Sequence, residues 1–471
     1  MEQFFVDFDA VLTSVNDAVW TYLLVAALIL CGLWFTWRTR FVQIRMLGDM
    51  LRQLVATSSK TATGRHISSF QAFAVSVATR VGTGNLAGVA TAIVVGGPGS
   101  VFWMWIIALI GAATAFVEST LGQLFKQRHL DSFIGGPAYY ILRGLHSRWM
   151  SVLFAVLITL TFGLSYNSIQ SNTICSAMHE AFGWSPVVVG LVLVVLSLTI
   201  VFGGIQRIAR VSSILVPVMA IGYFLLALFV IVTHLDQLPH VLRLIVGSAF
   251  GWEQAVGGGV GAAMMNGIKR GLFSNEAGEG SAPNVAATAH VAHPVAQGLV
   301  QALGVFTDTL LVCSCTAFII LISGQNASTD LTGIALTQSA LQSEIGSAGP
   351  VFVAVAIFLF AFSSIIGNYY YGEANIRFLT SNSTVMTVYR LLSGGAFVLF
   401  GALASLQVVW SIGDFFMALL TVCNLVAIVL LGKYVFRLLQ DYCRQRSSGI
   451  SQPQFHRDQL PELAGELDCW E

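Results

Sequence analysis

The sequence carries little charge. Only 10% of its 471 residues are Asp, Glu, Lys or Arg, and the formal net charge is zero. Soluble domains carry about 25% charged residues, whereas 56% of this chain is hydrophobic. This composition excludes a soluble fold, and the lack of a basic excess gives no reason to expect a nucleic-acid partner. We expect an all-α integral membrane protein that lies in a lipid bilayer.

Cysteine patterns and enzyme motifs are also missing. The seven cysteines form no CxxC pair, so we expect reduced thiols and neither a disulfide framework nor a zinc site. No nucleophile elbow, HExxH, Walker loop or deaminase pattern occurs, so enzyme chemistry has no support. The N-terminus lacks the basic region and short apolar stretch of a cleaved signal peptide.

Long apolar runs, by contrast, are abundant. Because about 20 apolar residues cross a bilayer, the sequence predicts about eleven transmembrane helices. The expected spans are roughly 17–37, 68–95, 99–125, 150–178, 185–203, 208–234, 254–290, 295–324, 348–375, 384–405 and 410–436.

Lys and Arg gather in alternate loops between these spans. One side of the membrane receives Arg38, Arg40, Arg45, Arg52, Lys60, Arg65, Lys126, Arg128, Arg143, Arg148, Arg207, Arg210, Arg377, Lys433, Arg437, Arg444 and Arg446. The other side holds Arg243 and the acids Asp7, Asp9, Asp17, Glu180, Asp236, Asp330 and Glu344. The positive-inside rule then predicts a plasma-membrane protein with its N-terminus outside and its C-terminus in the cytoplasm.

The spans divide into four parts. Residues 1–66 hold an extra first helix and the segment 41–54, which we expect as a helix in the cytoplasmic interface, with an ordinary connector as the alternative. Residues 67–235 and 236–437 form two five-helix repeats, which have opposite topology because five is odd. Residues 438–471 are expected as a short, flexible polar tail.

The first repeat begins with an interrupted helix. The apolar segment 68–95 contains Arg80-Val81-Gly82-Thr83-Gly84-Asn85 at its centre. Unpaired polar groups in hydrocarbon cost several kcal/mol, about 2 or more each, so we expect the helix to break there. The half-helix after the break offers free N–H groups to an anion such as an amino-acid carboxylate. A glycine-rich packing site is the alternative. The candidate substrate residues are Thr83, Gly84 and Asn85.

The second repeat begins with a similar interruption, in FSNEAGEGSAPN at 273–284. Acidic side chains inside a membrane usually have an ion-pair partner or line a water-filled pathway. Lys269, Arg270 and Arg80 are the expected partners. For Glu276, a substrate or cation contact and a structural ion pair are equally open, whereas for Glu279 we favour the ion pair. The candidate substrate residues here are Phe273, Ser274, Asn275, Glu276 and Gly278.

Polar residues in other spans add candidates. Gln170 either binds a ligand or bonds to a neighbouring helix. The carbonyls before the first break, near Ala78 and Val81, point away from the substrate and suit a cation. Ser363 and Ser364 are hard oxygen ligands of the kind such a cation needs, unless each bonds back to its own helix. Three further acids lie in or near spans: Glu118, Asp414 and Asp308, of which Asp308 is a gate, a proton site or an acid paired near an interface.

Four stretches carry a resemblance to a known family. They are RVGTGNLAGVATAI (80–93), GGPGSVFWMW (96–105), GGPAYYI (135–141) and NGIKRGLFSNEAGEGSAPNVAATA (266–289). With them the chain resembles the alanine or glycine:cation symporters across nearly its whole length. The resemblance implies the leucine-transporter type of five-plus-five inverted repeat, preceded by one extra helix. It also implies inward movement of small neutral amino acids, driven by sodium or sometimes protons.

The resemblance further implies two binding sites at the first break. The amides of Thr83 and Gly84 match those that hold the substrate carboxylate in the wider leucine-transporter group. One sodium site would consist of Ala78, Val81, Phe360, Ser363 and Ser364. Arg80 stands where the wider group often has a small residue, so we expect one cation and not two.

The favoured function is therefore a secondary active transporter for alanine, glycine or a similar amino acid. The alternative is a passive channel for a small solute, or a sensor built on a transporter fold. A channel would not concentrate its solute, and a sensor would bind without flux.

Overall fold

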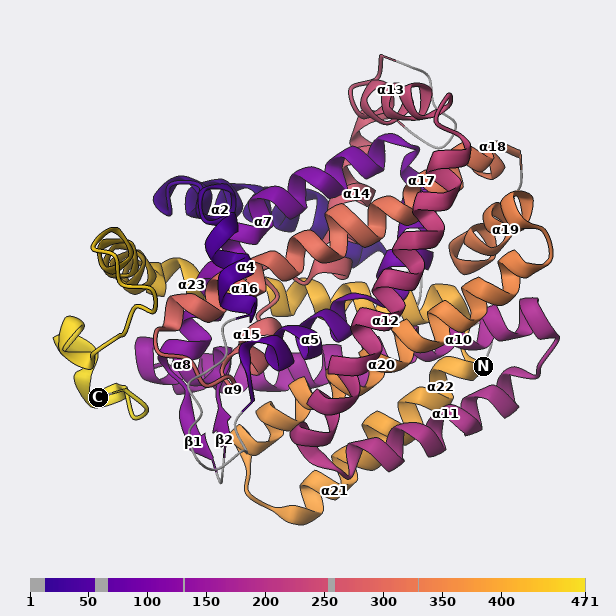
Figure 1. Cartoon of the computed structure of the whole chain (residues 1–471). Coiled ribbons are helices and arrows are strands. Elements are labelled where there is room, and N and C mark those ends of the chain that lie inside the picture. Colours follow the sequence, from indigo (N-terminus) through magenta and orange to yellow (C-terminus); the bar gives the residue numbers. More distant parts are fainter. Residues whose placement is uncertain (1–12, 56–66, 130–131, 253–258, 329, 471) are drawn as a thin grey trace.

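The computed structural model of the chain describes residues 13–55, 67–129, 132–252, 259–328 and 330–470, which form a bundle of helices (Figure 1). Lys60 and Arg65, Asp7 and Asp9, and the start of the expected span 254–290 lie outside the described residues. One antiparallel hairpin, β1 (Gln127–His129) with β2 (Ser132–Ile134), accompanies the helices. The helices are α2 (Val25–Arg38), α3 (Val42–Arg45), α4 (Leu47–Val55), α5 (Ser69–Arg80), α6 (Val89–Gly96), α7 (Gly99–Leu124), α8 (Pro137–Leu145), α9 (Arg148–Ile158), α10 (Asn167–Phe182), α11 (Pro186–Val201), α12 (Gly204–Thr233), α13 (Leu238–Ala249), α14 (Val260–Asn275), α15 (Ala282–Ala286), α16 (Pro294–Val305), α17 (Ser314–Ser323), α18 (Gln325–Ser328), α19 (Gly333–Ile345), α20 (Ala348–Leu379), α21 (Ser383–Leu391), α22 (Phe397–Leu403) and α23 (Leu406–Ser447).

Short non-α turns complete this list. π-helical turns join or extend several helices at Trp20–Leu24, Gly84–Gly88, Thr159–Tyr166, Phe306–Cys313 and Leu392–Ala396. Two 3-10 turns, Arg457–Gln459 and Pro461–Glu466, follow the last helix.

Among the described residues, eight helices are long and apolar enough to cross a membrane. They are Thr13–Arg38, Gly99–Leu124, Arg148–Phe182, Gly204–Thr233, Pro294–Ser323, Ala348–Leu379, Ser383–Leu403 and Leu406–Ser447. The helical membrane fold is therefore confirmed, with the hairpin as a small addition. The two interrupted helices and the shorter helix α11 stand at the other three expected positions, and the count of eleven stays a prediction.

The first interruption lies where the sequence places it. α5 begins with a capping box, in which Ser68 and Gln71 satisfy each other's backbone N–H groups. It ends at Arg80, Val81 is extended, and the helix resumes in the turn Gly84–Gly88. The segment between Ala72 and Ala90 is almost fully buried, so the break lies in the centre of the bundle.

The second interruption also lies where expected. α14 ends at Asn275, and Glu276, Gly278 and Gly280 all have positive φ angles, of 57°, 98° and 79°. The carboxylate of Glu118 on α7 accepts hydrogen bonds from the N–H groups of Gly278 and Gly280, at 3.3 and 3.1 Å. A structural role for Glu118 follows, because it pairs the N–H groups that the break exposes.

Loops that the sequence assigns to one membrane side contact one another. Gln53 of α4 bonds to Tyr442 of α23, and Arg446 pairs with Asp49. On the other side, His234 after α12 pairs with Glu344 of α19. In Figure 1 the hairpin lies at the lower left and α4 left of the centre, whereas α13 lies at the top and α18 and α19 lie on the right. Segment 41–54 does form helices, α3 and α4, whereas its place at the interface remains a prediction.

The C-terminal segment (residues 449–470) corrects one expectation, because it packs on the protein and is not a free tail. Its apolar residues Phe455, Leu460, Leu463, Leu467 and Trp470 are buried. The N–H of Phe455 donates to the carbonyl of Ala292, and the indole of Trp470 donates to that of Leu124. The composition was misleading because polar residues separate these five apolar anchors.

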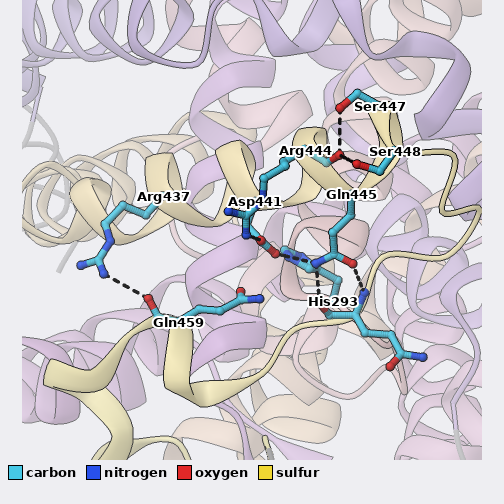
Figure 2. A network of polar contacts seen from close by, with 9 residues as sticks. His293, Arg437, Asp441, Arg444, Gln445, Ser447, Ser448 and Gln459 are labelled. Carbon is cyan, nitrogen blue, oxygen red and sulfur yellow. Dashed lines mark hydrogen bonds and ion pairs between the residues drawn. The ribbon is translucent and has the colours of Figure 1, made fainter.

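Polar contacts at the end of α23 hold the same segment (Figure 2). Arg437 donates to the carbonyl of Gln459 at 3.0 Å, and Gln445 exchanges hydrogen bonds with the backbone of Gln454. Asp441 lies 3.5 Å from Nε2 of His293, whose Nδ1 caps α16 by accepting the N–H of Val295. Burial lowers the pKa of His293 below its usual range.

Lys126 lies beneath the C-terminal segment. Its ammonium group stands 4.3 Å from the ring centre of Phe133 and 4.5 Å from that of Trp470, and it donates to the carbonyl of Ala289. Burial lowers the pKa of Lys126 to about 7. The C-terminal segment therefore covers the end of α7 and the stretch that follows the second break.

Candidate functional site

The two breaks meet at Gly84. A Cβ atom built on this glycine would lie 3.0 Å from Cα of Ser274 and 3.1 Å from the ring of Phe273. Such distances are shorter than ordinary carbon contacts, so the absence of a side chain is what allows this approach. The structure thus brings together the candidates Thr83, Gly84 and Asn85 of the first break with Phe273 and Ser274 of the second.

Gln170 of α10 reaches the first break with its side-chain oxygen. This oxygen accepts the N–H of Thr83 at 2.9 Å and its hydroxyl at 2.8 Å. The amide therefore bonds to the start of the neighbouring half-helix, at one of the N–H groups considered for an anion. Gln170 is therefore held against the first break by these two hydrogen bonds, and its side chain is buried.

Asp308 joins the two breaks from a third helix. Its carboxylate accepts the amide of Asn85 at 2.6 Å and the hydroxyls of Ser274 at 2.7 Å and Thr309 at 2.9 Å. The side-chain oxygen of Asn85 in turn accepts the N–H of Gly82. The sequence analysis singled out Asp308 as an acid in an apolar span but did not place it among the substrate-binding residues.

The five predicted sodium ligands lie together between α5 and α20, and all are buried. The hydroxyl of Ser364 lies 2.9, 3.0 and 3.4 Å from the carbonyl oxygens of Ala78, Phe360 and Val81. That of Ser363 lies 2.8 Å from the carbonyl of Phe360 and 3.3 Å from that of Ala78. Each serine bonds to its own helix and also across to α5. The hydroxyls therefore make the bonds of ordinary helix serines and also face the carbonyls of the predicted cation site.

Aromatic rings form one wall beside Gly84. Tyr166 and Trp410 each pack on Phe273, with ring centres 4.7 and 4.6 Å apart, and Phe162 packs on Tyr166. Tyr166 and Trp410 were not predicted. Aromatic residues are common in membrane helices, and nothing local distinguishes these two from packing residues.

The acids of the second break do not pair with Lys269 or Arg270, which corrects that expectation. Both bases bind Asp414 of α23, at 2.8 and 2.9 Å. Arg80 donates to the carbonyl of Gln301 on α16. Charge alone does not identify partners, because the register of α23 against α14 decides which acid the bases reach.

The acids themselves have hydroxyl partners. Glu276 accepts the hydroxyl of Ser281 at 2.5 Å and that of Thr79 at 3.4 Å, and Glu279 accepts the hydroxyl of Tyr166 at 3.3 Å. Glu276 therefore links the second break to Thr79 of α5, the residue that precedes Arg80.

The last two candidates, Asn275 and Gly278, contact other parts of the chain than the first break. The side-chain oxygen of Asn275 accepts the N–H of Ala277, within the second break itself. Gly278 faces Leu425 of α23 and Thr114 of α7. Neither contacts the first break through these atoms.

Comparisons with known proteins indicate the family to which the chain belongs. The model of the sodium:alanine symporter family matches residues 5–457. The probable sodium/glutamine symporter GlnT of Bacillus subtilis is 52% identical, over 97% of this chain and 94% of its own. The amino-acid carrier protein AlsT of the same organism is 48% identical, over 100% and 99%. The sodium/alanine symporter AgcS of Methanococcus maripaludis is 36% identical, over 91% and 96%.

Solved structures share the fold. A sodium-coupled sialic acid symporter in an outward-open state gives a TM-score of 0.51 with 16% identity, over 96% of each chain. A manganese transporter of Eremococcus coleocola gives 0.51 with 13% identity, over 89% of each chain. At these identities the likeness shows the fold alone. The family model and the full-length relatives show more: this chain is a multi-pass membrane protein that belongs to the sodium:alanine symporter family.

Proposed function

We propose that this chain is a sodium-coupled symporter that carries a small neutral amino acid, such as alanine or glycine, into the cell by alternating access. The observation that carries the proposal is the gathering of five neutral oxygens at the end of α5, three from carbonyls and two from Ser363 and Ser364. Neutral hard oxygens suit a small monovalent cation, and the carbonyl end of a helix adds its negative dipole.

The substrate carboxylate would bind the N–H groups of Thr83 and Gly84. The side-chain oxygen of Gln170 already accepts the N–H of Thr83, so the position favours an oxygen acceptor. A carboxylate oxygen would take over this hydrogen bond and add a charge to the positive end of the half-helix. Asp308, which Asn85 and Ser274 hold at the same place, supplies negative charge for the substrate ammonium group.

Gly82 would couple the two ligands. A Cβ atom on this residue would lie 2.4 Å from the hydroxyl of Ser364 and 2.8 Å from the side-chain oxygen of Gln170. The backbone of one residue therefore separates the proposed sodium site from the proposed carboxylate site. An ion that orders the end of α5 also orders the N–H groups that receive the substrate, so each ligand strengthens binding of the other.

The same proposal includes the membrane arrangement. Eleven spans, with an extra first helix before two inverted five-helix repeats, would place one broken helix at the start of each repeat. The contacts among basic loops on one side, such as Gln53 with Tyr442, are consistent with an N-terminus outside and a C-terminus in the cytoplasm.

Uptake of radiolabelled alanine into proteoliposomes tests the function. The purified chain is given an inward sodium gradient, an inward proton gradient, or neither. Accumulation above equilibrium with the sodium gradient supports the proposal, whereas equilibration without accumulation indicates a channel, and binding without flux indicates a sensor. Competition by unlabelled glycine, alanine and glutamine then identifies the substrate, since the relatives bear names for both alanine and glutamine.

A further inference from the structure

Glu279 is the least satisfied acid of the second break. It lies between two glycines and is fully buried. Its Oε2 accepts one hydrogen bond, from the hydroxyl of Tyr166 at 3.3 Å, and its Oε1 has no hydrogen-bond partner among the described residues. An ionised carboxylate without donors or a counter-ion is expensive to bury.

Among the described residues, the neighbouring groups give this carboxylate no second hydrogen bond and no ion pair. Glu276 and Glu118 are neighbouring acids of Glu279, and Arg80 is a neighbouring base. Arg80 donates to the carbonyl of Gln301, and no ion pair joins it to Glu279 in the part of the chain that the structure describes. The hydroxyl of Tyr166 already donates its hydrogen bond to Glu279.

Glu118 provides the contrast. It is equally buried, yet three donors surround its carboxylate: the N–H groups of Gly278 and Gly280 and the amide of Asn424, at 2.8 Å. These donors stabilise a negative charge. The two buried acids thus have opposite surroundings: Glu118 is arranged as an anion, and Glu279 as a neutral acid.

Glu279 also connects to the substrate site. The ring of Tyr166 packs on Phe273, and Phe273 approaches Gly84 closely enough that a Cβ atom there would lie 3.1 Å from its ring. A charge that forms on Glu279 would attract the hydroxyl of Tyr166 more strongly and shift the ring that supports Phe273. Protonation of Glu279 can therefore change the position of the rings beside the proposed substrate site.

We propose that Glu279 is a proton-binding site of the transport cycle, which holds one proton in the conformation described here. This inference rests on the proposed function for its transport role. On release, the O–H bond of the carboxyl group breaks, the electron pair stays on the carboxylate, and the proton passes to water that reaches the second break. On return to this conformation, the carboxylate takes one proton from water, and no other reactant is needed.

Infrared difference spectroscopy tests where the proton is, independently of transport. The spectrum of the purified wild-type chain at neutral pH, minus that of the Glu279→Gln variant, should contain the band of one protonated carboxyl group. The corresponding difference for Asp441→Asn, an acid whose carboxylate accepts hydrogen bonds from Arg444 and Gln445, should contain the bands of an ionised carboxylate. A carboxylate band for Glu279 would overturn the inference even if alanine transport proceeds as proposed.

Proteoliposomes that contain a pH-sensitive dye test the coupling. Wild-type protein should acidify the lumen when alanine enters, and alanine binding should weaken at alkaline pH. The Glu279→Gln variant should bind alanine with no alkaline loss and should move no protons. Alanine-dependent acidification that persists in this variant would refute the role, and so would wild-type uptake without acidification. Failure of sodium to drive accumulation would instead count against the proposed function.

The variant Tyr166→Phe keeps the ring and removes the one donor to Glu279. Because a hydrogen bond to a charged group favours the charged form, its loss should make Glu279 hold the proton about tenfold more tightly, about one pH unit. The alkaline loss of alanine binding should then occur at higher pH. An unchanged profile would show that the contact with Tyr166 does not act on a titrating carboxyl group.

Discussion

Gly82→Ala tests the central geometry of the proposed symporter. The new methyl group would lie 2.4 Å from the hydroxyl of Ser364 and 2.8 Å from the side-chain oxygen of Gln170, whereas ordinary contacts need about 3.5 Å. The φ angle of Gly82 is not positive, so the backbone itself tolerates alanine. The substitution therefore acts through these two side chains and not through strain.

The size of the effect follows from what must move. Ser364 has to rotate to another rotamer, which takes its hydroxyl away from the carbonyls of Ala78 and Phe360 and removes one of five oxygens. Gln170 has to withdraw from Thr83. Overpacking of this kind costs about 2 kcal/mol, which corresponds to about thirtyfold weaker sodium binding. Both sites change together, so alanine affinity should fall as well.

Gly88→Ala is the matched control. It lies on the same half-helix, and its built Cβ atom would be 3.7 Å from the nearest atom, the carbonyl oxygen of Thr83. Sodium titrations of alanine uptake in proteoliposomes compare the two variants with wild type, and thermal unfolding checks that both fold. Wild-type sodium dependence in Gly82→Ala would refute the placement of the ion beside Ser364.

Three further predictions concern other parts of the chain. Replacing both Ser363 and Ser364 by alanine should raise the sodium concentration for half-maximal uptake at least about tenfold, about 1.4 kcal/mol, and an unaltered sodium titration would exclude the site. Trp470→Ala removes a buried anchor worth about 3 kcal/mol and should expose the C-terminal segment to trypsin at Arg457, whereas Trp470→Phe should stay protected; equal cleavage of both would contradict the docking. Because burial lowers the pKa of His293, the folded state binds fewer protons than the unfolded state near pH 6.5, so docking should weaken as the pH falls below about 6.5. His293→Asn keeps a helix cap and should lose this pH dependence, as the same cleavage assay would report.

The sequence alone was enough to locate both breaks. Glycines and polar residues at the centre of an apolar segment cannot face lipid as a regular helix, and this local conflict is visible without a fold. The structure confirms the interruptions after Arg80 and after Asn275. The paired hydroxyls of Ser363 and Ser364 indicated cation ligands, but their assembly with specific carbonyls into one site came from the resemblance, since spacing along α20 does not indicate which carbonyls they reach.

Other features depend on contacts between residues far apart in the chain. Lys269 and Arg270 were assigned to the nearby acids of the break, but they bind Asp414, about 144 residues away. Nothing in the local sequence indicates that α23 brings an acid to α14. The buried anchors of the C-terminal segment were missed for a similar reason, because no regular periodicity marks them.

Hydropathy, glycine placement and charge in loops therefore determined the class of protein, the broken helices and the expected orientation, because each depends on the chemistry of a short stretch. Tertiary packing decided which groups meet: Gln170 with Thr83, Asp308 with Asn85, and Glu279 with Tyr166. The physical reason is that a buried polar group must find its partner wherever the packed helices bring one, and that position depends on the whole bundle.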